Sequence, residues 1–128
     1  MSLQLQFESR EFYLYAQASG QYSLSAVMSA FQQVMAESIS RGHQAVMVDV
    51  RSIDGAISFG DRFEFGAGMA QVLVGNNIHL AFMCRPDQVT PDRFLESVAI
   101  NRGAWLKVAT DMNDALHWLS LSTQQRTA

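Results

Sequence analysis

Apolar and polar positions alternate along the first part of the chain and then gather into longer runs, which predicts strands before helices. Residues 3–7 alternate with period two, and residues 12–18 form a second, aromatic-rich run. We expect these two runs to pair as an antiparallel hairpin. The next run, 45–51, is continuously apolar, which is typical of a strand buried on both faces of a parallel sheet. Residues 78–84 are predicted to form the following strand, and 105–109 to form a last short one.

The segments between and after these runs carry apolar residues at helical spacing. Ser23, Ser58 and Thr90 stand where N-caps are expected, and Pro91 would occupy the first position of the third helix. Gly42 is placed to end the first helix. The predicted helices cover residues 24–41, 59–74, 91–102 and 111–119.

The order β-β-α-β-α-β-α-β-α predicts an α/β fold. We expect a mostly parallel five-stranded sheet with an antiparallel N-terminal hairpin and four helices. Residues 1–120 would form one domain, and the polar residues 121–128 would form a frayed tail.

Composition narrows the class of protein. The chain has 128 residues, of which 48% are hydrophobic, so it can bury a full core. A net charge of −3 argues against nucleic acid as a partner, because phosphate binding needs a basic face. The single cysteine, Cys84, fits a reducing compartment. No apolar run reaches the roughly 20 residues of a spanning helix, so we expect a cytoplasmic protein.

One charged pattern occurs twice. Asp61-Arg62-Phe63-Glu64 and Asp92-Arg93-Phe94-Leu95-Glu96 each open a helix-like segment, and each follows a strand-like run that ends in arginine. Open α/β sheets bind ligands at the carboxyl ends of their strands. The guanidinium groups there could hold a carboxylate or phosphate bidentately, or they could form ordinary surface ion pairs. The candidate anion-binding residues are Arg51, Arg62, Arg85 and Arg93.

The second predicted helix carries more apolar surface than one stripe requires. Phe59 and Phe63 belong to the stripe expected to face the sheet, whereas Phe65 and Met69 fall on the far side. A neighbouring helix or a dimer partner could bury the second stripe. Alternatively, the helix could be a mobile lid over an apolar pocket, or it could contact a membrane surface. We take Phe59, Phe63, Phe65 and Met69 as the candidate ligand or membrane contacts.

Residues with catalytic or metal-binding chemistry are scattered. His43, His79 and His117 share no ligand spacing, and none lies near Cys84 in a metal pattern. Neither a nucleophile elbow nor a phosphate loop is present. We therefore expect no enzymatic activity, no cofactor and no metal.

The residues that carry a family resemblance run from the strand ending Val48-Asp49-Val50-Arg51, through the two repeated motifs, to Asn101-Arg102-Gly103 and Trp118-Leu119. Over about residues 3–120 the chain resembles the SpoIIAA-like family, whose biochemical role is poorly defined. Its members share the fold of STAS domains, the anti-sigma-factor antagonists, and are grouped with CRAL-TRIO lipid-binding domains. The resemblance places Ser58, within Ile57-Ser58-Phe59-Gly60, where STAS antagonists carry a phosphorylatable serine in the sequence Asp-Ser-Ser-Gly.

Two functional hypotheses follow. The first is a non-enzymatic domain that binds a small hydrophobic or amphipathic ligand, with peripheral association at the inner membrane face through the second helix. The alternative is a STAS-type regulatory module that binds a protein partner and is switched by phosphorylation of Ser58. A homodimer is compatible with both hypotheses.

Overall fold

The computed structural model describes residues 2–127, with side chains as far as Ser122. Its sheet has five strands in the order β1-β2-β3-β4-β5. The first two strands pair antiparallel and each later pair is parallel, which confirms the predicted fold class. The strands are β1 (Gln4–Ser9), β2 (Leu14–Gln21), β3 (Ala45–Asp54), β4 (His79–Met83) and β5 (Trp105–Ala109).

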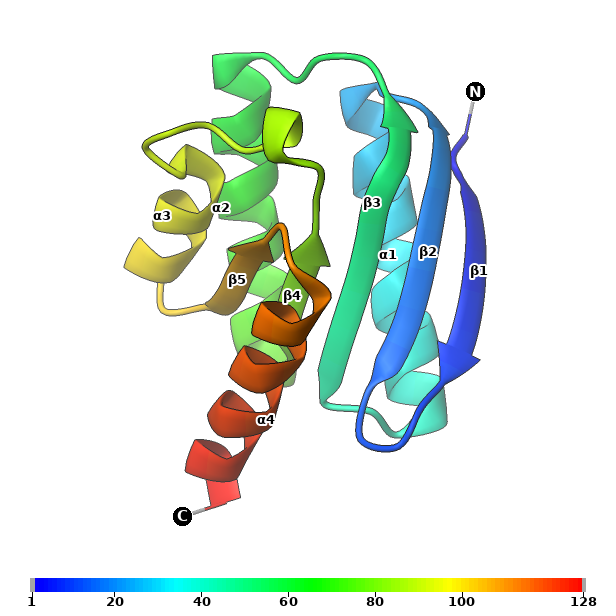
Figure 1. Cartoon of the computed structure of the whole chain (residues 1–128), viewed down its shortest axis with the longest axis vertical. Coiled ribbons are helices and arrows are strands. Elements are labelled where there is room, and N and C mark those ends of the chain that lie inside the picture. The colour runs from blue at the N-terminus through cyan, green and yellow to red at the C-terminus, as the bar shows by residue number, and fades with distance from the viewer. Residues whose placement is uncertain (1, 128) are drawn as a thin grey trace.

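The helices cover the two faces of the sheet unequally (Figure 1). The strands lie in chain order and their crossovers are right-handed, so α1, α2 and α3 all fall on one face. Helix α4 follows the last strand and lies on the other face, over β3, β4 and β5. The helices are α1 (Leu24–Arg41), α2 (Phe59–Asn76), α3 (Phe94–Asn101) and α4 (Met112–Thr127), with a short 3-10 turn η1 (Pro86–Gln88) before α3.

Two apolar clusters hold these layers together. Val46 and Val48 of β3 point into the larger cluster beneath α1 and α2, whereas Met47 points into the smaller one beneath α4. All three side chains are buried, so this strand is covered on both faces as predicted. On its own side of the sheet α4 lies over β3, β4 and β5 and leaves β1 and β2 uncovered (Figure 1). Exposed polar residues of β1 such as Gln4 and Gln6 lie on that side, opposite the larger cluster.

Most of the predicted helix ends are confirmed. The Ser23 hydroxyl accepts the Ala26 N–H at 3.1 Å, and Gly42 adopts the left-handed conformation, with φ 75°, at the end of α1. At its other end the chain stays helical: the segment 121–128, expected as a frayed tail, continues α4 as far as Thr127.

The predicted start of α3 is wrong. Pro91 lies in a turn rather than in the first helical position, and the helix begins at Phe94. Arg93 interrupts the helical backbone because it adopts the left-handed conformation, with φ 51°. The Thr90 hydroxyl still accepts a helix N–H, that of Phe94, at 3.2 Å. The two Asp-Arg-Phe motifs are therefore not equivalent, since Asp61 lies inside its helix and Asp92 precedes its own.

Candidate functional site

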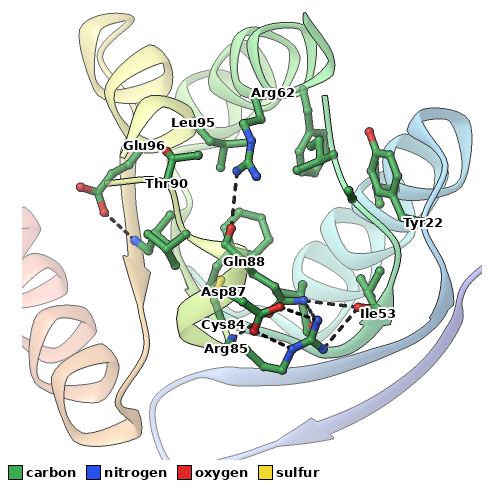
Figure 2. Close-up of a pocket in the computed structure, with 18 of the residues that line it drawn as sticks. Tyr22, Ile53, Arg62, Cys84, Arg85, Asp87, Gln88, Thr90, Leu95 and Glu96 are labelled. Carbon is green, nitrogen blue, oxygen red and sulfur yellow. Dashed lines mark hydrogen bonds and ion pairs between the residues drawn. The ribbon is translucent and has the colours of Figure 1, made fainter. Parts of the chain in front are cut away.

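A pocket of about 240 Å³ opens at the carboxyl ends of the parallel strands, between α2, η1 and the start of α3 (Figure 2). This is the edge of the sheet where the sequence predicted a site. Apolar side chains of the larger core cluster form much of its wall, and polar side chains from the loops and helix starts complete it. The lining residues include Val50, Ile53, Ile57, Arg62, Phe65, Phe82, Cys84, Arg85, Gln88, Arg93, Leu95 and Glu96.

Arg85 and Gln88 fasten the η1 turn to the end of β3. Strand β3 continues past its last pairing with β4, at Asp49, so the carbonyl groups beyond that point lack a strand on the β4 side. The Gln88 amide donates to the carbonyl of Val50 at 2.9 Å, and its side-chain oxygen accepts the backbone N–H of Arg85 at 2.7 Å. The Arg85 guanidinium donates to the carbonyl groups of Arg51 and Ile53. These side chains take the place of the missing strand.

Arg93 and Glu96 close the free edge of β5 in a similar way. The Glu96 carboxylate accepts the backbone N–H of Val108 at 2.6 Å, and the Arg93 guanidinium donates to the Val108 carbonyl at 2.9 Å. The two side chains also lie 4.0 Å apart as an ion pair. Both hydrogen-bonding groups of this edge residue are therefore occupied, which protects the strand from pairing with another chain. The bond to Val108 also helps to hold Arg93 in its unusual backbone conformation.

Arg51 lies outside the pocket. Its guanidinium binds the Asp49 carboxylate at two points, 3.0 and 2.7 Å, on the α4 side of the sheet. The Tyr15 hydroxyl donates to the same carboxylate at 2.6 Å. Burial acts to raise the pKa of Asp49, but the hydrogen bonds from Arg51 and Tyr15 outweigh it, and the pKa lies below its usual value. Arg51 thus forms the ion pair that was one of the two alternatives, and it does not join the three arginines of the pocket wall. The binding of an anion stays a prediction.

Arg62 differs from the other three arginines. Figure 2 shows its side chain pointing from α2 toward Gln88 across the pocket. Its hydrogen bond to the Gln88 carbonyl is long, at 3.5 Å, and no carboxylate within the described side chains lies within ion-pair distance of it. Of the four candidates, Arg62 alone combines a place in the pocket wall with no carboxylate partner among the described side chains.

The two apolar stripes of α2 have exchanged roles relative to the prediction. Phe65 and Met69 are buried in the core, whereas Phe59 and Phe63 are 70% and 44% exposed. A Cβ atom at Gly66 would lie 3.1 Å from the Val98 side chain, so α2 must turn this glycine toward α3. That close approach fixes the rotation of α2 and directs Phe65 and Met69 to the sheet. The prediction that Phe65 and Met69 lie on the far side of the helix, away from the sheet, is therefore wrong.

Ser58 is the N-cap of α2, as predicted. Its exposed hydroxyl accepts the backbone N–H of Asp61 at 3.1 Å. The Asp61 carboxylate accepts the Tyr22 hydroxyl at 2.8 Å, which ties the start of α2 to the loop before α1. Burial and this hydrogen bond raise the pKa of Tyr22 above its usual value, so Tyr22 stays protonated and keeps donating.

The site offers little catalytic chemistry. Cys84 lines the pocket, but burial raises the pKa of its thiol to about 12, so the thiolate is scarce at neutral pH and nucleophilic attack is disfavoured. Among the side chains that the structure describes, no group of three His, Cys, Asp or Glu residues could hold a metal ion. None of the helices described is both long enough and apolar enough to cross a membrane. The expectations of no enzyme, no cofactor and no metal stay predictions.

The fold is that of STAS domains, which confirms the SpoIIAA-like resemblance at the level of structure. An anti-sigma factor antagonist from Mycobacterium paratuberculosis superposes with a TM-score of 0.61 at 15% identity, covering 93% of this chain and 95% of that one. RsbS from Moorella thermoacetica, in a serine-to-glutamate variant, gives 0.59 at 7% identity, covering 94% and 97%. An uncharacterized DUF3478 protein with a SpoIIAA-like fold, from Shewanella loihica, gives 0.53 at 22% identity, covering 92% and 93%.

At these identities the likeness establishes the fold alone. No protein-family model matches the sequence, and neither does any curated protein. The first of these structures is described as an anti-sigma factor antagonist, and none of the three is described as a lipid-binding protein.

Sequence reasoning missed the polar residues that build the pocket wall. Gln88 and Glu96 were not singled out, yet each satisfies backbone groups of a strand far away in the chain. Tyr22 was also missed. No signal of the unpaired end of β3 was present in the sequence, because the runs that predict β3 and β4, 45–51 and 78–84, are equally long. The partner of each unpaired carbonyl is also set by a distant loop, which no local pattern reveals.

Proposed function

We propose that the protein is a non-enzymatic regulatory module of the STAS type that binds a partner protein through the start of α2. The contact surface would be the Phe59–Phe63–Phe94 patch, which lies directly beside Ser58. The anti-sigma factor antagonists that share this fold support a protein rather than a lipid as the partner. The observation that carries the proposal is the 70% exposure of Phe59 next to Ser58.

The patch is built to stay on the surface. Phe59 stacks on Phe94, with ring centroids 4.3 Å apart, and the Arg102 guanidinium lies 5.2 Å from the centre of the Phe63 ring. These contacts hold the rings in place without covering them. Exposed aromatic rings of this kind are enriched at the centres of protein interfaces, where they supply much of the binding energy.

The charges around the patch favour a protein over an anionic membrane. Asp61, Glu64 and Asp92 lie in or next to the segments that carry the rings, and the whole chain has a net charge of −3. Bilayers on the cytoplasmic side carry negative surface potential and attract basic segments. Arg62 and Arg102 also lie beside the rings, so the rim carries both signs and suits the mixed charges of a protein surface, whereas the net negative charge of the chain opposes binding to anionic lipid.

Phosphorylation of Ser58 would change this surface directly. The hydroxyl is exposed, and a phosphate would add about 1.5 to 2 negative charges beside Asp61 and the Phe59 ring. The N-terminus of α2 would accept that charge locally. A partner that covers the Phe59 ring with apolar groups would then have to desolvate a strongly hydrated dianion beside the ring. We expect the modified form to bind the partner more weakly.

Site-specific photocrosslinking in cells of the native organism tests the proposal. We would place p-benzoylphenylalanine at Phe59, and at Gln6 as a control on the uncovered face of β1. We expect one discrete protein adduct from position 59 and none from position 6. Ser58→Asp keeps an N-cap acceptor and adds charge, so it should lower the adduct yield several-fold, whereas the neutral cap Ser58→Asn should not.

Three results would overturn the proposal. One is an equal adduct yield from positions 59 and 6. Another is an adduct yield at position 59 that Ser58→Asp leaves unchanged. The third is sedimentation of the purified protein with vesicles containing anionic lipid that Phe59→Ser abolishes. This last result would assign the patch to a membrane surface.

A further inference from the structure

We propose that the pocket at the carboxyl ends of β3, β4 and β5 binds a small amphipathic monocarboxylate, with Arg62 as the partner of the carboxylate. The ligand's apolar body would lie against the core side chains of the pocket wall. This pocket adjoins the Phe59–Phe63–Phe94 patch, because Arg62 also lines the hollow beside Phe59 and Phe94, but the inference does not depend on the proposed function.

Of the three arginines in the pocket wall, Arg62 is the one that remains available to bind the ligand's carboxylate. Arg85 is held by the carbonyl groups at the end of β3, and Arg93 is held by the Val108 carbonyl and Glu96. Arg62 makes only its long contact of 3.5 Å with the Gln88 carbonyl. A guanidinium group has five N–H donors in a fork that matches a carboxylate, so Arg62 retains the capacity for a bidentate pair.

The charges of the side chains in the pocket wall favour a ligand with one negative charge over a ligand with two. Arg85 is paired with Asp87 at 3.0 Å, and Arg93 lies 4.0 Å from Glu96. Each pair cancels its own charge and leaves the single positive charge of Arg62. A monoanionic carboxylate matches that remainder, whereas a phosphate dianion would leave one charge uncompensated beside Asp87 and Glu96.

Volume and lining set the size and character of the ligand's body. Packed protein interiors leave few voids larger than a water molecule, and this pocket holds about 240 Å³. An apolar cavity of about 150 Å³ is known to take benzene, so scaling by volume gives a ligand of roughly ten non-hydrogen atoms. Val50, Phe65, Phe82 and Leu95 line the pocket and would contact an alkyl chain or an aromatic ring. Octanoate and 3-phenylpropanoate have this size.

Calorimetry and amide chemical-shift mapping on the full chain test the inference with octanoate and octan-1-ol as probes. On the unmodified protein, octanoate should bind more tightly than octan-1-ol although it is the more hydrophilic of the two. Shifts should concentrate at the residues of the pocket wall. Arg62→Gln should weaken octanoate by about tenfold or more and leave octan-1-ol unchanged, because it removes only the charge-assisted hydrogen bonds. Arg41→Gln, which changes an arginine at the end of α1 outside both the pocket and the patch, should affect neither probe.

Each alternative outcome overturns a stated part of the inference. If octanoate binds no better than octan-1-ol to the unmodified protein, Arg62 does not bind the carboxylate. This comparison does not need the variant, so it remains decisive if Arg62→Gln fails to fold. If neither probe binds at millimolar concentration, the pocket is not a ligand site. If octyl phosphate binds more tightly than octanoate, the charge argument fails. If the crosslinker at position 59 gives no protein adduct but octanoate binds as expected, the proposed function is rejected and this inference still holds.

Discussion

Replacing Phe65 by alanine should destabilise the protein strongly, and replacing Phe59 should not. The Phe65 ring is 8% exposed and meets the rings of Phe31 and Phe82 at centroid distances of 6.1 and 6.3 Å. Truncating a buried phenylalanine costs about 3–5 kcal/mol of unfolding free energy. Because the ring already borders the pocket, we expect a value near the lower limit, about 3 kcal/mol. Phe59 loses only its stacking on Phe94, worth about 1 kcal/mol or less for an exposed pair.

Urea unfolding followed by far-UV circular dichroism measures the unfolding free energy of both variants, each of which changes one residue of α2. With a slope of about 2 kcal/mol per molar urea, the Phe65→Ala midpoint should fall by about 1.5 M and the Phe59→Ala midpoint by less than about 0.5 M. The slopes should match that of the unmodified protein. Equal losses, or a larger loss for Phe59→Ala, would mean that α2 packs in the orientation that its sequence suggested.

Three further measurements test the polar contacts. Burial acts to raise the pKa of Asp49, but the hydrogen bonds from Arg51 outweigh it, so the pKa of the folded state lies below that of the unfolded state. The ionised Asp49 carboxylate therefore stabilises the fold above the unfolded pKa, and this stabilisation is lost as pH falls. Asp49→Asn should flatten the decline in unfolding free energy between about pH 5 and 2, and an unchanged slope would refute this. Gln88→Ala should speed amide exchange in residues 50–57 but not in β1, because it frees the η1 turn from the end of β3. Ser58→Ala should cost about 1 kcal/mol of stability whereas Ser58→Asn costs little, and equal losses would remove the capping role.

The predicted elements agree with the structure where their signals are local. Ser23 and Ser58 cap their helices through hydroxyl contacts three residues away, and a sequence pattern can encode such a short range. The start of α3 was misplaced although Thr90 and Pro91 gave a strong local signal. There the bond from Arg93 to Val108 supports a left-handed backbone that local preference disfavours, and a contact across 15 residues is not visible in the pattern.

The candidate site could be located from the sequence but not built from it. The strand–helix order places function at the carboxyl edge of the sheet, and Arg62, Arg85 and Arg93 do line a pocket there. Their separate roles depend on which carbonyl groups the sheet leaves unpaired. That in turn depends on β3 being longer than β4, a mismatch between two strands that meet only in the folded chain.

By itself the sequence determined the order of the elements, the burial of β3 on both faces and the caps, because periodicity and capping act over a few residues. Tertiary structure alone decided which stripe of α2 faces the core. Both stripes are apolar, so hydrophobicity cannot choose between them. The choice falls to packing, since Gly66 must face Val98 for α2 and α3 to approach closely. That single steric requirement buries Phe65 and Met69 and leaves Phe59 and Phe63 in solvent.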